Sequence, residues 1–328
     1  MSLMVLAIGG NSLIRSGEKG TDLGQLDHAR GIAAQIVGLI RKGYRIVLTH
    51  GNGPQVGGEL LRSECAAGQI PGHALDICDA ATQGQMGYLL EQALENEMKE
   101  RGVRMPVVTL VTQCVVSLDD PAMSRPSKPV GPFYTQAEAE ERRRSLGWTI
   151  VEDAKRGYRR VVPSPKPLQI VEWEEVARLA DSGVLVIACG GGGIPVAWIN
   201  GKLTGVEAVI DKDHTSALLA SKLRAGIFVI GTDTDYVYLN YKQPAQQPLH
   251  VVDLPQLEAH ALAGHFATGS MGPKVNAALQ FLREGGREAI ICSCDSLCTA
   301  VEGLTGTHIL PSQERKEPVL TPEHVLAA

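Results

Sequence analysis

The sequence predicts an α/β protein, a three-layer αβα sandwich with a mostly parallel central sheet. Apolar runs of strand length alternate along the 328 residues with segments whose apolar residues recur every three or four positions. This pattern is typical of strands joined by helices that cover both faces of a sheet. Hydrophobic residues make up 44% of the chain, enough to fill the core of one large domain or two closely joined lobes. Glycine-rich turns follow several of the strand-like runs.

The first third of the chain predicts three strands separated by two helices. The apolar run Leu3–Ile8 is the first strand. The first helix carries an apolar stripe at Leu26, Ala29, Ala33, Ile36 and Ile40. Gly43 follows the stripe, where the C-terminus of a helix often needs a left-handed residue. Residues 45–49, 80–99 and 107–111 then predict a strand, a long helix and a strand.

The regular alternation is interrupted between about residues 117 and 167. This stretch contains Asp119, Asp120, the basic run Arg142-Arg-Arg144 and several prolines. A loop of this length is unusual in a compact domain unless it is functional. We interpret it as an inserted, separately folded unit that projects over the functional site. An ordinary surface elaboration is the alternative.

After the insertion the alternation of strands and helices resumes. Asn200-Gly201, between two strand-like runs, is a strong signal for a β-hairpin. A helix is expected to follow Lys212 as far as about Leu223. The remaining predicted helices are Trp173–Asp181 and 273–284, and the remaining strands are 184–188, 227–230, Val237–Leu239, 289–293 and 308–310.

Composition excludes several classes of protein. The net charge of −5 and the pI of about 6.0 give no general attraction to nucleic acid, so an anion site must be a local pocket. No apolar run approaches the ~20 residues of a membrane span, and the N-terminus predicts a strand instead of a signal peptide. Seven cysteines without Cys-x-x-Cys spacing argue against disulfides or structural zinc and favour the cytoplasm. Cys292, Cys294 and Cys298 could be a metal or redox cluster, but buried structural residues are favoured.

Three glycine-rich turns follow predicted strands: Gly9-Gly10-Asn11, Gly51-Asn52-Gly53 and Gly190 to Gly193. Ligands gather at the carboxyl edge of open α/β sheets, and turns without side chains let an anion approach the backbone N–H groups. Asparagine tolerates a left-handed backbone and can donate from its amide. A Walker loop is excluded because no Gly-Lys-Ser/Thr closes a turn. A Rossmann site is poorly supported because the third glycine is missing.

Three lysines lie in separate short motifs. Lys128 lies in the insertion, Lys212 between Asp211 and Asp213, and Lys274 at the end of Gly269-Ser-Met-Gly-Pro-Lys274. Fixed ammonium charges beside bare N–H groups are what a protein needs to hold a phosphoryl group during transfer. The residues therefore predict a phosphotransferase. Surface salt bridges of Lys212 and a solvated Lys274 at a helix start are the alternatives.

The surroundings of Lys212 and Lys274 support binding of nucleotide phosphate. The Lys212 triplet follows the apolar run 206–210, which predicts a strand-to-helix turn, and either aspartate could approach Mg²⁺. Pro273 is expected at the first position of a helix, so Lys274 opposes the helix dipole unless an anion lies nearby.

Three further features have two interpretations. The acidic turn Thr232-Asp233-Thr234-Asp235 suits Mg²⁺ or a ribose hydroxyl, and it equally suits a helix cap. Tyr236, Tyr238 and Tyr241 could flank an adenine, although core packing is favoured. His50 is expected to form structural hydrogen bonds, because an anionic acceptor oxygen needs no general base.

Taken together, these motifs resemble those of a known protein family. The chain resembles the carbamate kinases, and with them the amino-acid-kinase fold, over nearly its whole length. The shared motifs are Gly9-Gly-Asn11, Thr49-His-Gly-Asn-Gly-Pro-Gln-Val-Gly57, Gln83-Gly84 with Gly87-Tyr88, Lys128-Pro-Val-Gly-Pro-Phe-Tyr134, Gly157-Tyr-Arg-Arg-Val-Val-Pro-Ser-Pro-Lys-Pro167, Gly190-Gly-Gly-Gly-Ile-Pro-Val196, Asp211-Lys-Asp213, Asp235 with Val237-Tyr-Leu-Asn240, and Gly269-Ser-Met-Gly-Pro-Lys-Val275.

The resemblance implies the reversible reaction ATP + carbamate = ADP + carbamoyl phosphate, used to make ATP in the catabolism of arginine or purine derivatives. It implies an N-terminal lobe (1–202) for the carbamoyl end, a C-terminal lobe (203–328) for the nucleotide, and a homodimer. Mg²⁺ would accompany the nucleotide, with no metal fixed by the protein. No nucleic acid or membrane partner is expected.

The resemblance also implies roles for individual residues. Lys128 would reach the small substrate from the insertion, while Lys212 and Lys274 would bind the transferred phosphoryl group. The implied substrate-binding residues are Gly9, Gly10, Asn11, Gly51, Asn52, Gly53, Gly191 and Gly192. The implied nucleotide-binding residues are Asp211, Thr232, Asp233, Asp235, Tyr238, Met271 and Lys274.

Some positions depart from the family pattern. Gly231-Thr-Asp-Thr-Asp-Tyr236 stands where Leu-Thr-Asp-Val-Asp-Ala is usual, so Tyr236 is expected to alter the nucleotide edge. Thr82 replaces a serine, Ser12 replaces an alanine, and Cys292-Ser-Cys-Asp-Ser is unlike the usual apolar ending. The alternatives are a kinase of another small carboxylate and a non-catalytic nucleotide or metabolite sensor. Because all three lysines are present, we expect activity.

Overall fold

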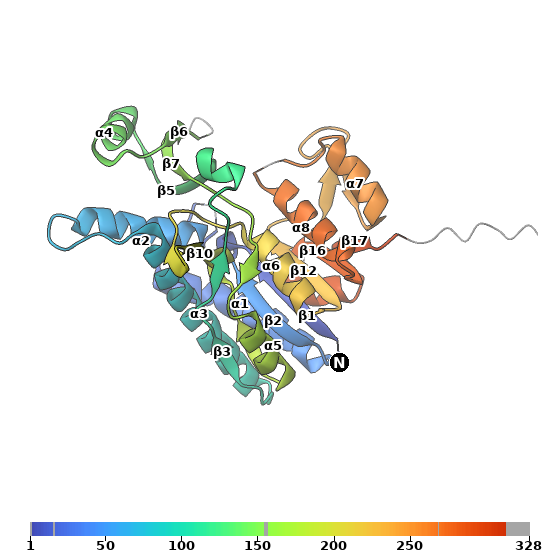
Figure 1. Ribbon diagram of the computed structural model, residues 1–328. Helices are drawn as coiled ribbons and strands as arrows, with labels where there is room; N and C mark the ends of the chain where they lie inside the picture. Colours follow the sequence, from blue (N-terminus) through green and yellow to red (C-terminus); the bar gives the residue numbers. More distant parts are fainter. Residues whose placement is uncertain (1, 16, 154–156, 268, 313–328) are drawn as a thin grey trace, which may run out of the picture.

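The computed structural model describes residues 2–15, 17–153, 157–267 and 269–312. Its main sheet has eight strands in the order β15-β17-β16-β12-β1-β2-β9-β3 (Figure 1). Neighbouring strands are parallel except for the antiparallel pair β16 and β17. The strands are β1 (Leu3–Ile8), β2 (Arg45–His50), β3 (Val107–Thr109), β9 (Leu185–Ile187), β12 (Ile227–Thr232), β15 (Val251–Asp253), β16 (Glu288–Ser293) and β17 (Thr307–Leu310). The predicted mostly parallel sheet is confirmed.

Helices cover both faces of this sheet. In β1 every residue is buried, and alternate residues face opposite layers: Met4 and Leu6 belong to one core cluster, Val5 and Ala7 to the other. The first layer contains α1 (Asp22–Arg41), α3 (Leu75–Glu100) and α9 (Leu297–Val301). The second contains α5 (Trp173–Asp181), α6 (Lys212–Lys222), α7 (Leu254–Leu262) and α8 (Met271–Arg283). The three-layer αβα sandwich is therefore confirmed.

The register of the central strands places the glycine turns together. β1 and β2 run parallel with Ile8 opposite His50, so Gly9 and Gly51 leave the sheet side by side. β9 pairs with β2 on the other side, with Ile187 opposite Leu48. The three turns therefore share the carboxyl edge of the sheet, where ligands of open α/β folds bind.

Two smaller sheets flank the main one. The four-stranded sheet has the order β11-β10-β4-β8, and β13 (Val237–Leu239) pairs with β14 (Gln247–Leu249). The four strands are β4 (Gln113–Val115), β8 (Gln169–Ile170), β10 (Ile194–Ile199) and β11 (Lys202–Gly205). Asn200 and Gly201 join β10 and β11 with φ values of 50° and 76°, as the sequence predicted for this hairpin.

The insertion forms a folded unit that projects from the main body at the upper left of Figure 1. It consists of the three-stranded sheet β5-β7-β6 with helix α4, and Tyr134, Ala139 and Ile150 form its own small core. Its elements are β5 (Lys128–Tyr134), α4 (Gln136–Leu146), β6 (Ile150–Glu152) and β7 (Tyr158–Val162). Residues 154–156, which join β6 to β7, lie outside the described residues.

The insertion rests on α2 (Gly53–Ala66). A Cβ on Gly57 would lie 3.1 Å from the Cα of Gly131, so the two backbones are in close contact. Arg142 of α4 forms an ion pair with Glu64 of α2, both about four-fifths buried. These contacts fix β5, and with it Lys128, above the carboxyl edge of the sheet.

Several predictions of local structure were wrong. The run 206–210 is not a strand; Val206, Ala208 and Ile210 are buried in a bent segment that joins β11 to α6 outside any sheet. Helix α8 begins at Met271, so Pro273 is its third residue and not its first. Helices α2 and α4 were not predicted, because their few buried residues leave no apolar stripe.

Two further findings concern the state of the cysteines and the apolarity of the helices. All seven cysteines are free, and Cys292 and Cys294 are buried as predicted, whereas Cys298 is half-buried. Of the helices that the structure describes, none combines the length and apolarity that crossing a membrane requires.

Candidate active site

The first two glycine turns are in direct contact. The 3-10 turn Gly10–Ser12 follows β1, and a Cβ on Gly10 would lie 3.1 Å from the backbone nitrogen of Asn52. A Cβ on Gly51 would lie 2.9 Å from the nitrogen of Gly10 and 3.0 Å from Cδ of Lys212. Larger residues would separate the two turns, and so glycine is required here for close approach of the backbones.

The third turn closes against the second turn and α6. Its 3-10 segment Gly190–Gly192 has positive φ at Gly191 (68°) and Gly192 (98°). A Cβ on Gly191 would lie 2.4 Å from Nδ2 of Asn52, and one on Gly192 would lie 2.4 Å from the carbonyl oxygen of Ile210. Thr215 of α6 donates its hydroxyl hydrogen to the Gly192 carbonyl at 2.8 Å. All three turns thus surround the N-terminus of α6.

Two of the predicted lysines share one carboxylate. Nζ of Lys212 contacts Oδ1 of Asp213, and Nζ of Lys274 lies 3.2 Å from Oδ2 of the same side chain. All three side chains are largely buried, with exposed fractions of 10%, 17% and 4% for Lys212, Lys274 and Asp213. Burial opposes ionisation of Asp213, but the two ammonium groups outweigh it and hold the pKa of this carboxyl well below its usual range.

The third lysine reaches the same helix terminus from the insertion. Nζ of Lys128 donates to Oδ2 of Asp211 at 2.8 Å. Asp211 is the N-cap of α6, and its Oδ1 accepts from the backbone nitrogen of Asp213 at 3.0 Å. Burial and the charge of Asp213 raise the pKa of Asp211, and Lys128 reverses this so that the net shift is downward. The structure thus brings Lys128, Lys212 and Lys274 onto two neighbouring carboxylates.

Of the residues predicted for the nucleotide, Thr232 and Asp233 lie at the carboxyl end of β12, and Met271 and Lys274 lie on α8. Thr232 ends this strand, and its hydroxyl donates to Oδ1 of Asp233 at 3.2 Å. Met271 begins α8 and packs against the core one turn before Lys274. Burial lowers the pKa of Lys274, but Asp213 outweighs burial, with smaller contributions from Asp211 and Asp233, so the pKa is raised. The negative charge of Asp233 therefore acts on Lys274.

Tyr238 lies in an aromatic group on β13. Its ring centroid is 6.2 Å from that of Tyr236, edge-on, and 5.8 Å from that of Tyr241. Burial, followed by the nearby charge of Asp235, raises the pKa of Tyr238, which places Asp235 beside this group. Tyr236, the unusual residue of this turn, packs edge-on against His250 and accepts a hydrogen bond from Thr305.

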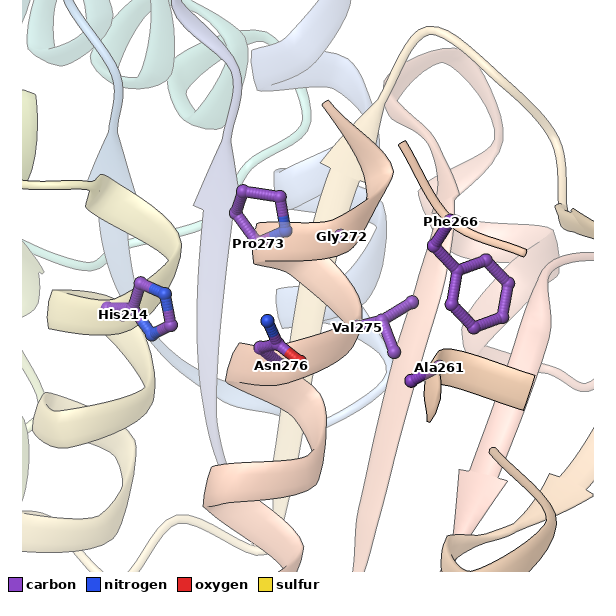
Figure 2. A pocket seen from close by; sticks show the side chains of 7 residues that line it. All are labelled: His214, Ala261, Phe266, Gly272, Pro273, Val275 and Asn276. Atoms are coloured by element: carbon purple, nitrogen blue, oxygen red, sulfur yellow. The ribbon is translucent and has the colours of Figure 1, made fainter. Parts of the chain in front are cut away.

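A cavity of about 380 Å³ lies between α6, α8, the end of α7 and the segment that follows it (Figure 2). His214 follows Asp213 on α6, and Pro273 and Val275 flank Lys274 on α8. The remaining lining residues are Ala261, Phe266, Gly272 and Asn276. No sequence pattern predicted this cavity, because its walls come from three segments that are separated in the chain.

Asp79 was not singled out from the sequence, and Thr82 was noted only as a replacement of serine, but the structure adds both to the site. Asp79 and Thr82 lie on the buried face of α3, and both contact the side-chain amide of Asn52. Burial raises the pKa of Asp79 to about 7. The available signal was an aspartate and a threonine three positions apart, and so on one face of a helix, with Cys78, Ala80 and Ala81 beside them.

His50 is fully buried at the end of β2. Its Nδ1 lies 3.2 Å from the carbonyl oxygen of Gly51, which fixes the tautomer as a donor at this nitrogen. Burial, with a further contribution from Lys212, lowers the pKa of His50 to about 4. The ring is therefore neutral at pH 7, in agreement with the expected structural role.

Comparison with known proteins decides the family. The sequence profile of the amino acid kinase family matches residues 2–293. The carbamate kinase of Thermococcus kodakarensis is 48% identical over 315 residues, covering 94% of this chain and 99% of the relative. The chain belongs to the carbamate kinases of the amino acid kinase family. The carbamate kinase of Trichomonas vaginalis is 41% identical over 312 residues, with 94% and 99% coverage.

Solved structures agree with this membership. A carbamate kinase from Giardia lamblia bound to AMP-PNP superposes with a TM-score of 0.90 and 41% identity, covering 95% of this chain and 99% of that one. The same carbamate kinase bound to citric acid gives 0.89. The resemblance to carbamate kinases and the amino-acid-kinase fold with its protruding subdomain are confirmed.

Proposed function

We propose that the protein catalyses reversible phosphoryl transfer between ATP and carbamate, as expected of a phosphotransferase similar to the carbamate kinases. The single observation that carries the proposal is the buried pair Lys212 and Lys274 on Asp213, beside three glycine turns. A phosphoryl group in transfer spreads negative charge over its oxygens. Two fixed ammonium groups and bare backbone donors are suited to stabilise that charge without reorganisation.

The proposed substrate pocket is formed by the glycine turns. Carbamate offers little surface for binding, so positioning must come from nearby donors and charges. Lys128 would contact the carbamoyl end, because it reaches the N-terminus of α6 from the projecting insertion. The other residues proposed for the substrate are Gly9, Gly10, Asn11, Gly51, Asn52, Gly53, Gly191 and Gly192. No general base is needed, because the carbamate oxygen is already ionised.

The proposed nucleotide site extends from Lys274 toward the end of β12. The cavity beside His214 is lined by Pro273 and Val275, the residues on either side of Lys274 in the chain. The residues proposed for the nucleotide are Asp211, Thr232, Asp233, Asp235, Tyr238, Met271 and Lys274. Among the described residues, no group of three or more His, Cys, Asp or Glu side chains is arranged as a metal site. We infer that Mg²⁺ would arrive with the nucleotide phosphates.

The proposal also covers the two lobes, the oligomeric state and the compartment of the protein. Residues 1–202 would form the lobe for the carbamoyl end, with the insertion at about 117–167, and residues 203–328 the lobe for the nucleotide. Exposed apolar side chains on α3 and β10, which include Tyr88 and Trp198, support a homodimer. Seven free cysteines support a reducing compartment such as the cytoplasm.

One assay tests the proposed reaction. The protein is mixed with carbamoyl phosphate, ADP and Mg²⁺, and ATP formation is measured. We expect ATP well above the level of a Lys212→Ala variant, and equal levels would overturn the proposal. Acetyl phosphate in place of carbamoyl phosphate tests a kinase of another small carboxylate. Binding of ADP without turnover of either compound would indicate a sensor.

A further inference from the structure

The side-chain amide of Asn52 is held in one orientation by α3. Its Nδ2 donates to Oδ1 of Asp79 and, at 2.8 Å, to Oγ1 of Thr82. Thr82 in turn donates its own hydroxyl hydrogen to the backbone carbonyl of Asp79 at 2.8 Å. Because that hydrogen is already used, Thr82 can only accept from Asn52. The network therefore settles which end of the amide faces α3.

This orientation determines what Asn52 can still do. An amide nitrogen has two hydrogens, and both are directed at α3. The oxygen Oδ1 is left as a pure acceptor: no donor of the described residues is bonded to it, and it is not among the buried atoms without a partner. Asn52 also lies between the turns, with its backbone nitrogen against Gly10 and its amide against Gly191. An unused acceptor thus lies among the turns proposed to hold the substrate.

The chemistry of that acceptor separates carbamate from its analogues. Carbamate and acetate have the same shape, but carbamate carries an amino group that donates hydrogen bonds and acetate carries a methyl group that does not. A site built around a substrate N–H rejects an analogue that lacks it, because the buried partner is left unpaired. We propose that Oδ1 of Asn52 accepts from the substrate amino group and selects for it, with Asp79 and Thr82 as positioning residues. This inference rests on the proposed function.

The test compares two phosphoryl donors in the same variants. ATP formation from MgADP is measured with carbamoyl phosphate and with acetyl phosphate, and the ratio of their kcat/KM values gives the selectivity. In Asn52→Leu, which keeps the size and removes the acceptor, we expect kcat/KM for carbamoyl phosphate to fall roughly tenfold to hundredfold, with a smaller change for acetyl phosphate. If acetyl phosphate is turned over too slowly to measure, its inhibition constant against carbamoyl phosphate replaces its kcat/KM.

The positioning role has its own variants. Thr82→Val removes the hydroxyl, frees one amide hydrogen and should lower the selectivity several-fold, while Thr82→Ser keeps the hydroxyl and should restore it. The dissociation constant of ADP and the denaturation midpoint report whether each variant is folded. Equal losses on both phosphoryl donors in Asn52→Leu, or a Thr82→Val enzyme with unchanged selectivity, would overturn the inference. Failure of the unaltered protein to make ATP from carbamoyl phosphate would instead overturn the proposed function.

Discussion

Lys274 lies with its Nζ 3.2 Å from Oδ2 of Asp213, although 61 residues separate them in the chain. The other oxygen of Asp213 contacts Lys212, so two cations share one buried carboxylate. The same two cations are those that we propose to hold the migrating phosphoryl group. Asp213 therefore holds both side chains in place when no phosphate is present. Asp213 thus has a structural as well as an electrostatic role, and the structural role can be tested by measuring the free energy of unfolding.

Replacement of Asp213 by asparagine should destabilise the protein strongly. The change leaves two buried ammonium groups without a counter-ion, and breaking a buried pair typically costs about 3–5 kcal/mol. We expect the free energy of unfolding in a denaturant titration to fall by that amount. Asp295→Asn is the control, because Asp295 pairs with Arg15 at the surface with 76% of its side chain exposed. Comparable losses in the two variants would contradict the buried network.

Replacement of Gly51 by alanine should lower kcat strongly. The new methyl group would lie 2.9 Å from the nitrogen of Gly10 and 3.0 Å from Cδ of Lys212, so the lysine must shift. A misplacement of about 1 Å at a catalytic group can reduce the rate about a hundredfold. Gly31→Ala is the control, because Gly31 is an exposed residue of α1 outside the proposed site and a Cβ there meets nothing within 4 Å. We expect Gly31→Ala to keep most of the activity in the ATP-formation assay, and a similar loss of kcat in both variants would be evidence against the steric argument.

The sequence predicted the sheet and its edge better than it predicted the contacts at that edge. Continuous apolar runs such as Leu3–Ile8 identify strands buried on both faces, and glycine turns after them indicate the ligand edge. By contrast, the sharing of Asp213 by two lysines depends on how α6 and α8 pack. The hydrogen bond between Asp79 and Asn52 likewise depends on how α3 packs against α2 and the Gly190–Gly192 turn. No local pattern encodes such pairings, because each joins segments distant in the chain.

Replacement of Lys128 by alanine should weaken the use of carbamoyl phosphate more than the binding of ADP. Lys128 reaches Asp211 at the N-terminus of α6 from the insertion, whereas the other residues proposed for the nucleotide lie from the end of β12 to β13 and on α8. We expect KM for carbamoyl phosphate to rise and the dissociation constant of ADP, measured by calorimetry, to change little. Lys42→Ala is the control: its side chain is 39% exposed, against 40% for Lys128, and it is paired with Glu302. Equal losses for both ligands would contradict the placement of Lys128 at the substrate.

The burial of His50 should make stability depend on pH. Its pKa is lowered from 6.5 to about 4 by burial, so below pH 6.5 the unfolded chain binds a proton that the folded protein does not. Stability from this group is therefore complete above pH 6.5 and is lost as the pH falls toward 4, by at most about 1.4 kcal/mol per pH unit. Asp79 acts in the opposite direction over much of this range, because its pKa is raised to about 7.

The two contributions are separated by comparing His50→Gln with the unaltered protein at each pH. Because glutamine does not titrate, the stability difference between the two proteins should shrink steadily from pH 7 to pH 4. Denaturant titrations at closely spaced pH values measure it, and His73→Gln, at an exposed histidine, is the control. A difference that stays constant over this range would show that His50 is not held neutral by burial. The outcome also bears on the site, because a neutral ring beside Lys212 adds no positive charge that would compete with it for the phosphoryl oxygens.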